Sequence, residues 1–417
     1  MLGNGYLMTA GSGGSLRRSG MTTPAPVAPP AAAAPLDATE RLHAIDILRG
    51  LALFGMILVH FHQKTRLEVT GVEDLIPWAV WVGVEQKAWA TFAFLFGVGF
   101  AILLRRLEAR GAAVIPIYLR RLATLACFGI IAEVGFGFSI LWAYAMWGLA
   151  LLVVRRWSTR ALIVTAAIAA SIKPIVAEVS ALSAAWSGSP HVVSTSAVWY
   201  QAVEAATHQK SYLTLLAARW DLFVATHPAT WQDFLPDVNL ALFILGLLAV
   251  RHGILDQPKQ HVRTIARWMI FGALSWGTAW LVLRNIPTPA IPGADWPITY
   301  GFGLVQDQWL CFTYIGAVVL LLAYRPVWTA QLAAFGRSGR MALTNYMFQA
   351  AVLDIVSSGY GLDWKLRPYV YVVAAVLLFT VEALFSTAWL ERFRFGPLEW
   401  VWRTLTYARY QPVRRAT

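Results

Sequence analysis

Long apolar runs, separated by short polar and basic segments, dominate the chain from about residue 47 onward. Several of these runs cover roughly 17 to 25 residues, the length that an α-helix needs to cross about 30 Å of hydrocarbon. The ten-residue alternating pattern typical of a membrane β-barrel is absent from the sequence. The pattern therefore predicts about ten spanning helices, centred near residues 47–62, 86–104, 121–138, 140–154, 161–182, 234–250, 264–284, 303–324, 340–358 and 368–390.

The segments outside these runs differ in composition. Residues 1–40 are rich in Gly, Ser, Pro and Ala without apolar periodicity, which predicts a flexible tail. The long connection at 183–233 contains the periodic stretch YLTLLAARWDLFVA, which predicts an amphipathic helix on the membrane surface or over a cavity. We expect a single membrane-embedded domain over 41–410, followed by a short basic tail at 411–417.

Composition and charge support a membrane location. The chain is 58% hydrophobic and 13% charged, whereas soluble domains carry about 25% charged residues. We therefore predict an all-α, polytopic helical bundle in the lipid bilayer of a cell membrane, and expect a bacterial inner membrane. Lys and Arg concentrate in alternate loops, which favours an even number of spans with both termini in the cytoplasm. This distribution accounts for the net charge of +12, so we predict no nucleic-acid partner.

The first apolar run, LRGLALFGMILVHFHQ, carries Arg49 and His60. Eleven helical residues separate them by roughly 16 Å and return to within about 20° of the same face. Ionisable groups in a membrane are costly to bury and normally face the bundle interior or water. Arg49 and His60 are therefore either anchors at the two membrane edges or parts of one site inside the bundle.

Carboxylates fall at the predicted level of His60 on other spans. Glu133, Asp237, Asp307 and Asp354 all lie toward the outer halves of their runs. A carboxylate bonded to one imidazole nitrogen raises the basicity of the other, as a general base requires. Glu133 and Asp307 are the candidate partners of His60, and the alternative is that they are helix-end carboxylates wetted by the outer interface.

A polar stripe follows one face of the run RMALTNYMFQ. Asn345 and Gln349 are four residues apart, so they share a helix face. Such a stripe can bind a substrate or bridge two helices through hydrogen bonds. The later stretch FGPLEWVWR predicts a surface helix on the cytoplasmic side, in which Glu399 can pair with Arg403.

Motifs for other chemistries are missing from the sequence. It contains no metal-ligand spacing, no phosphate-binding glycine loop and no Gly-x-Ser-x-Gly elbow. We therefore predict no metal site. Gly97 and Gly99, in FLFGVGFA, are predicted to permit close helix packing.

Several segments resemble known families. IDILRGLALFGMILVH resembles the first membrane helix of the transmembrane acyltransferase superfamily, and the spacing of Arg49 and His60 is similar to that of acyltransferase family three. FAFLFGVGFAILLRR, GRMALTNYMFQA and FGPLEWVWRTLTY resemble the YeiB-like family, catalogued as domain of unknown function 418. The resemblance covers roughly residues 41 to 410.

Three positions depart from that family's pattern. The family typically has a histidine and an aspartate where this chain has Ala132 and Ser139, and an asparagine near the end of the first span, where this chain has His60. The departures leave two interpretations: the chemistry is altered or lost, or its polar group has moved to His60.

The resemblance implies a membrane acyltransferase. It would move an acyl group, such as acetyl, from acyl-CoA to a hydroxyl or amino group of an envelope glycan, a lipid or a small metabolite. His60 would serve as general base or transient acyl carrier. The phosphates of coenzyme A would be attracted by arginines on the cytoplasmic side, namely Arg49, Arg105, Arg106, Arg120 and Arg121. The alternatives are a transporter or permease for a small solute, since buried charges and a Lys173-Pro174 interruption also suit a translocation path, and a non-catalytic membrane protein.

Overall fold

The computed structural model describes residues 43–187, 196–227, 235–285 and 308–414. Within these ranges the chain is an all-α bundle, and the only β pairing is two isolated bridges. The predicted tail at 1–40 lies outside the described residues.

The helices follow the predicted apolar runs, and each of the ten predicted segments contains one. In chain order the elements are α1 (His43–Thr65), η2 (Gly71–Asp74), α2 (Leu75–Gly83), α3 (Lys87–Ala109), α4 (Val114–Phe136), α5 (Leu141–Val154), α6 (Thr159–Ser187), α7 (Ser196–Thr207), α8 (Tyr212–Thr226), α9 (Val238–Arg251), α10 (Val262–Asn285), η4 (Gln308–Leu310), α12 (Cys311–Tyr324), α13 (Val327–Gln331), α14 (Ala333–Arg340), α15 (Ala342–Ser357), α16 (Pro368–Arg392) and α17 (Pro397–Tyr407).

Length and composition identify the helices that can cross a membrane. Among the described residues, five stretches are long and apolar enough: His43–Thr65, Gly71–Ala109, Val114–Phe136, Thr159–Val176 and Pro368–Arg392. Three shorter apolar helices accompany them, Leu141–Val154, Val238–Arg251 and Gln308–Tyr324. The chain is therefore an all-α helical membrane protein, while ten crossings and the side of the termini stay predictions.

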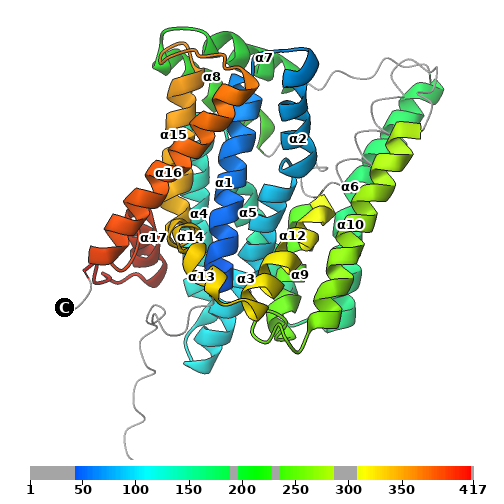
Figure 1. The fold of residues 1–417 in the computed structure, drawn as a ribbon, viewed down its shortest axis with the longest axis vertical. Helices are drawn as coiled ribbons and strands as arrows, with labels where there is room; N and C mark the ends of the chain where they lie inside the picture. Colours follow the sequence, from blue (N-terminus) through cyan, green and yellow to red (C-terminus); the bar gives the residue numbers. More distant parts are fainter. Residues whose placement is uncertain (1–42, 188–195, 228–234, 286–307, 415–417) are drawn as a thin grey trace, which may run out of the picture.

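Helix α1 lies in the middle of the bundle (Figure 1), where it packs against α3, α14, α15 and α16. The backbones of α1 and α14 touch because two glycines face each other's helix. A Cβ atom on Gly50 would collide with the carbonyl oxygen of Phe335, and one on Gly339 with that of Asp46. Small residues at such points let membrane helices approach closely.

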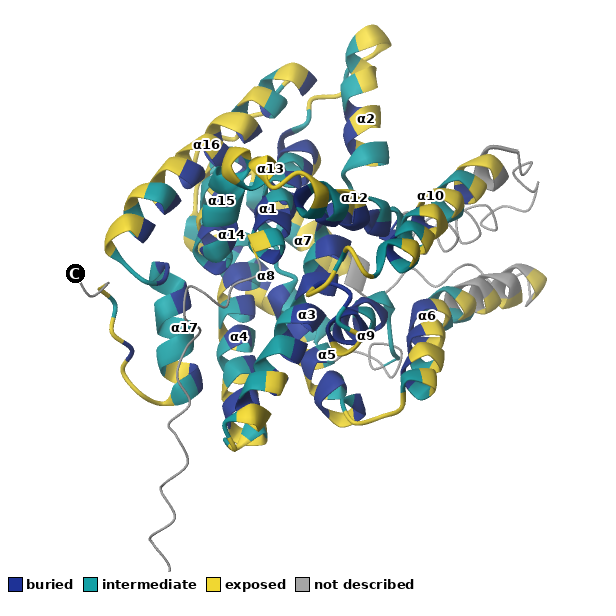
Figure 2. Cartoon of the chain, turned by 60° about the horizontal axis from the view of Figure 1, so that its bottom comes forward, coloured by how far each residue is buried: buried dark blue, intermediate teal, exposed yellow. Residues whose placement is uncertain are grey.

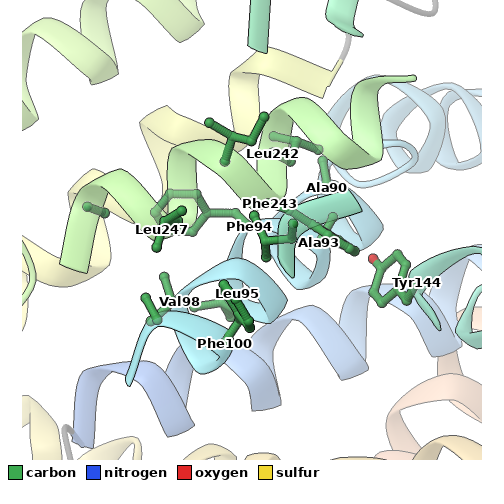
Figure 3. Packing of buried hydrophobic residues seen from close by; sticks show 14 of the residues in the cluster. Ala90, Ala93, Phe94, Leu95, Val98, Phe100, Tyr144, Leu242, Phe243 and Leu247 are labelled. Atoms are coloured by element: carbon green, nitrogen blue, oxygen red, sulfur yellow. The ribbon is translucent and has the colours of Figure 1, made fainter. Parts of the chain in front are cut away.

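A second close contact joins α3 to α9, at the centre of the larger apolar core (Figure 3). Phe94 and Phe243 are both fully buried there. A Cβ atom on Gly97 would meet the carbonyl oxygen of Phe243, and one on Gly246 would meet that of Phe94. The prediction that Gly97 permits close helix packing is thus confirmed.

Helices α6 and α10 each present an exposed face (Figure 2), and large apolar side chains lie on it. Ile163, Val164 and Ile168 on α6 and Phe271 and Leu274 on α10 each expose more than half of their surface. In a membrane protein such faces are the ones that lie against lipid.

Helices α7 and α8 cover the end of the bundle that lies away from α17 (Figure 1). The predicted amphipathic helix is α8, which begins after the N-cap Ser211. Its Arg219 is 4% exposed, and Arg219 Nη1 donates to Asp354 Oδ2 of α15 at 2.9 Å. This buried ion pair fastens α8 to the bundle.

The α3–α9 contact leads to a stability prediction. Gly246→Ala would force the two helices apart, and we expect it to lower the free energy of unfolding by about 1–3 kcal/mol. The measurement is thermal unfolding of the purified protein in detergent. The control is Gly83→Ala, because no atom lies within 4 Å of a Cβ built there. Equal melting temperatures for the two variants would contradict this account of the interface.

Candidate functional site

A cavity of about 320 Å³ lies at the end of the bundle where α3 ends and α4 begins. Its walls come from α1, α3, α4, α5, α14, α15 and α17. The volume falls in the range of small-molecule sites, which is roughly 300 to 1,000 Å³. We call it the arginine cavity after its lining.

Arginine is the commonest charged residue around this cavity. Eight arginines line it: Arg49, Arg105, Arg106, Arg110, Arg121, Arg340, Arg394 and Arg403. The carboxylates in the lining are Asp46, Asp256 and Glu399. The cavity is therefore strongly electropositive, and planar guanidinium groups are suited to binding phosphate or carboxylate oxygens.

Four of the five arginines predicted to attract phosphates meet here, and the fifth does not. Arg49, Arg105, Arg106 and Arg121 line the cavity. Arg120 is exposed on α4, and its Nε donates to the carbonyl oxygen of Thr406 at 3.0 Å. The role of Arg120 is therefore to hold α17 against α4.

Two carboxylates neutralise part of the arginine charge. Arg49 Nη1 lies 3.2 Å from Asp46 Oδ1, and Arg105 Nη1 lies 2.8 Å from Asp256 Oδ2. Gly99 also lines the cavity, and a Cβ atom there would lie 3.4 Å from Arg49 Nη2. Gly99 therefore lies in van der Waals range of the Arg49 guanidinium.

Aromatic rings of the carboxyl-terminal segment support two other arginines. The guanidinium carbon of Arg121 lies 3.8 Å from the ring centroid of Trp402, and that of Arg403 lies 4.6 Å from the ring of Phe395. The indole Nε1 of Trp402 also donates to the carbonyl oxygen of Arg121 at 3.0 Å. Cation–π contacts of this kind hold a charged group without neutralising it.

Glu399 of α17 caps the first turn of α15. Its Oε1 accepts hydrogen bonds from the backbone N–H groups of Leu343 and Thr344 at 2.6 and 3.1 Å, and its Oε2 accepts one from the Thr344 hydroxyl. The positive end of a helix dipole favours a carboxylate there. Burial raises the pKa of Glu399, and the hydrogen bonds from Thr344 and Leu343 oppose that rise.

Apolar and aromatic side chains also line the cavity and form what we call its apolar wall, among them Phe96, Leu141, Tyr144 and Tyr346. Both tyrosine hydroxyls are held by the backbone. The Tyr144 hydroxyl donates to the carbonyl oxygen of Trp89 at 3.1 Å, and the Tyr346 hydroxyl accepts from the N–H of Ile140 at 3.3 Å. The cavity can therefore accept an amphiphilic anion, with its charge among the arginines and its apolar part against this wall.

His60 lies near this wall but does not line the cavity. Its ring centroid is 4.2 Å from that of Phe138, which in turn lies 6.4 Å from the ring of Tyr346. His60 Nδ1 is buried and has no hydrogen-bond partner among the described residues. Arg49 and His60 thus lie on one helix, as predicted, and Phe138 contacts both the His60 imidazole and Tyr346 of the cavity lining.

Glu133, one of the two predicted carboxylate partners, contacts a different histidine. The Glu133 carboxylate lies 3.9 Å from His227 Nε2, the residue that follows α8. Asp307 lies outside the described residues. Asp354 pairs with Arg219, and Asp237 pairs with Lys173 at 3.8 Å.

Asn345 and Gln349 share a buried face of α15, as predicted, but neither lines the arginine cavity. Asn345 Nδ2 donates to Ser386 Oγ of α16 at 3.0 Å. Of the two roles that the sequence left open, this contact supports the bridging of helices.

The positions that depart from the family pattern have apolar or structural surroundings. Ala132 is fully buried in α4. Ser139 Oγ accepts a hydrogen bond from the N–H of Leu141, at the start of α5. Among the described residues, no group of three or more His, Cys, Asp or Glu side chains could hold a metal ion.

Four arginines of the cavity were missed as site residues: Arg110, Arg340, Arg394 and Arg403. Arginines outside the apolar runs are equally typical of topological anchors. Only the packing of α14, α15 and α17 around the end of α3 brings them to one place, so no local pattern could have distinguished them.

Two family models match different parts of the chain. Residues 249–409 match the family described as Protein of unknown function (DUF418). Residues 41–216 match the family described as Heparan-alpha-glucosaminide N-acetyltransferase, catalytic. No solved structure matches the chain.

Relatives cover nearly the whole chain. The protein described as Uncharacterized protein YxaH, from Bacillus subtilis, is 28% identical, over 91% of this chain and 97% of its own length. YeiB of Escherichia coli is 25% identical, over 88% and 96%. Residues 249–409 thus match the DUF418 family and the chain as a whole is similar to YeiB, which confirms the predicted resemblance. The match at 41–216 further indicates similarity to an acyltransferase-like membrane enzyme.

The Glu399 cap leads to a second stability prediction. Glu399→Ala leaves two N–H groups at the start of α15 without their acceptor, and we expect the free energy of unfolding to fall by about 1–2 kcal/mol. Thermal unfolding in detergent measures it. Glu391→Ala is the matched control, since Glu391 is exposed near the end of α16. A melting temperature unchanged by Glu399→Ala would show that the cap contributes nothing.

Proposed function

We propose that this protein is a membrane acyltransferase that takes an acyl group, such as acetyl, from acyl-CoA. The acceptor would be a hydroxyl or amino group of an envelope glycan, a lipid or a small metabolite. The observation that carries the proposal is the arginine cavity, which combines eight arginines with an apolar and aromatic wall. The similarity of residues 41–216 to an acetyltransferase catalytic domain supports the reaction class.

The cavity suits the two chemically different parts of acyl-CoA. The phosphates would lie among Arg49, Arg105, Arg106 and Arg121, whose guanidinium groups can donate paired hydrogen bonds to phosphate oxygens. The acyl end would lie toward Tyr144 and Tyr346. Because arginines concentrate on the cytoplasmic side of membrane proteins, the donor would enter from the cytoplasm.

His60 is the proposed general base. An imidazole nitrogen of His60 would take the proton from the acceptor hydroxyl or amino group as its oxygen or nitrogen attacks the thioester carbonyl carbon. The new C–O or C–N bond forms while the C–S bond breaks. The sulfur leaves as a thiolate and takes up a proton, giving coenzyme A.

Phe138 is the proposed control on access to the base. Its ring lies between His60 and Tyr346, with centroids 4.2 and 6.4 Å away. A change in its rotamer would open a path from the apolar wall of the cavity to His60. The acceptor would then meet the donor between the cavity and the end covered by α8.

Acyl transfer by the purified protein tests the proposal. Radiolabelled acetyl-CoA and longer acyl-CoAs are supplied with envelope extract, and label in the acceptor fraction is counted. We expect wild type to transfer label. The rate of transfer by His60→Ala should be lower by a factor of about 100 or more, because a general base usually contributes that much.

His62→Ala is the matched control, because His62 Nδ1 lies 3.1 Å from the Tyr371 hydroxyl in the smaller apolar core. It should keep most of the transfer. Equal transfer by wild type and His60→Ala would exclude His60 as the base. A transporter would be favoured if none of the acyl-CoAs supported transfer and the protein instead carried a solute across the membrane of sealed vesicles.

A further inference from the structure

The last turn of α4 receives hydrogen bonds from α8. The final carbonyl groups of a helix have no partner within the helix itself. The carbonyl oxygen of Gly135 accepts from the Tyr212 hydroxyl at 3.2 Å and from Arg219 Nη1 at 3.0 Å. Both donors belong to α8, which covers this end of the bundle (Figure 1). Helix α8 therefore caps α4, and we call Tyr212 and Arg219 the α8 clamp.

The Arg219 guanidinium is held between two elements. Its Nη1 and Nη2 donate to the carboxylate of Asp354 in α15. It also lies against Gly137, the C-cap of α4, because a Cβ atom built there would be 2.8 Å from Arg219 Nη2. Gly137 has a φ of 77°, a left-handed conformation that glycine adopts without steric cost. The guanidinium thus joins α15 to the end of α4.

The carboxylate of Asp354 has further donors. The Ser358 hydroxyl donates to its Oδ1 at 3.0 Å, and the Tyr360 hydroxyl donates to its Oδ2 at 2.9 Å. Asp354 is fully buried and Arg219 is 4% exposed. A buried ion pair whose oxygens accept additional hydrogen bonds keeps a defined geometry. The α8 clamp is therefore fixed from the side of α15.

The residue after Gly137 is Phe138, whose ring packs on α1. The ring centroid lies 4.2 Å from that of His60 and 5.0 Å from Lys64 Nζ. His60 and Lys64 are four residues apart, so they share one face of α1. Phe138 therefore covers the face of α1 that carries His60, and its backbone belongs to the connection that follows the capped end of α4.

We propose that Tyr212 and Arg219 are positioning residues, which hold Phe138 against His60 by capping the end of α4. Movement of α8 away from α4 would remove both donors from Gly135 and release the connection that carries Phe138. Access to His60 is thereby coupled to the position of α8. The meaning of that access for catalysis rests on the proposed acyl transfer, whereas the α8 clamp itself does not.

Two neighbouring tyrosines provide a matched test. The rings of Tyr212 and Tyr360 lie 5.0 Å apart, but the Tyr212 hydroxyl donates to Gly135 and that of Tyr360 to Asp354. Hydrogen–deuterium exchange of the full chain in detergent is followed in peptides that cover residues 135–141. Because one hydrogen bond to the connection is lost, Tyr212→Phe should speed exchange there by about fivefold. Tyr360→Phe should leave it unchanged.

The reactivity of His60 reports its contact with Phe138. Diethyl pyrocarbonate modifies accessible imidazole groups, and His60 and His62 fall in one tryptic peptide, residues 50–64. Tandem mass spectrometry of this peptide gives the rate at each histidine. Release of Phe138 should raise the rate at His60 relative to that at His62 in Tyr212→Phe. The ratio should not change in Tyr360→Phe.

A paired substitution removes the other donor to Gly135. Arg219→Met combined with Asp354→Leu leaves no buried charge without its partner. We expect this variant also to show faster exchange at residues 135–141 and a higher rate at His60.

Unchanged exchange in both Tyr212→Phe and the paired variant would overturn the proposal, as would equal increases in Tyr212→Phe and Tyr360→Phe. Faster exchange without a higher rate at His60 would also overturn it, because α8 would then cap α4 without positioning Phe138. Neither readout requires acyl transfer, so an absence of transfer would count against the proposed function alone.

Discussion

The repulsion between arginines that line one cavity is the constraint on which this structure depends. Like charges destabilise one another unless carboxylates, hydrogen bonds or solvent offset them. Asp46 and Asp256 neutralise two of the eight, while Trp402 and Phe395 support two others with their ring faces. Since Asp256 and Trp402 are distant in sequence from Arg105 and Arg121, these two offsets exist only when α3 packs beside the α9–α10 connection and α4 packs beside α17.

Helix α17 contributes most to this arrangement despite lying outside the candidate spans. It carries Glu399, Trp402 and Arg403 into the cavity wall. It is fastened to α4 by Arg120 and to α15 by the Glu399 cap. The lining contains eight arginines and three carboxylates, and this excess of positive charge favours an anionic ligand.

The helices were predictable because the length of each apolar run and the charges beside it indicate a membrane helix without reference to the rest of the fold. The contact of Gly97 with α9 followed from residue size alone. The site was predictable only in part. Arg49, Arg105, Arg106 and Arg121 were predicted, but Arg120 turns to α17, and Phe138 separates His60 from the cavity. These differences arise from tertiary packing, which places Asn345 against Ser386 of α16 and Glu133 beside His227.

The most direct test of the arginine cavity is the affinity of the purified protein for coenzyme A, measured by titration calorimetry at low salt. Loss of one charged hydrogen-bond donor costs about 1.5 kcal/mol or more, so Arg49→Gln should weaken binding by about 10-fold or more. Arg120→Gln, which removes the same charge outside the cavity, should change the affinity by less than about twofold. Equal losses in both variants, or no binding by wild type, would contradict the account.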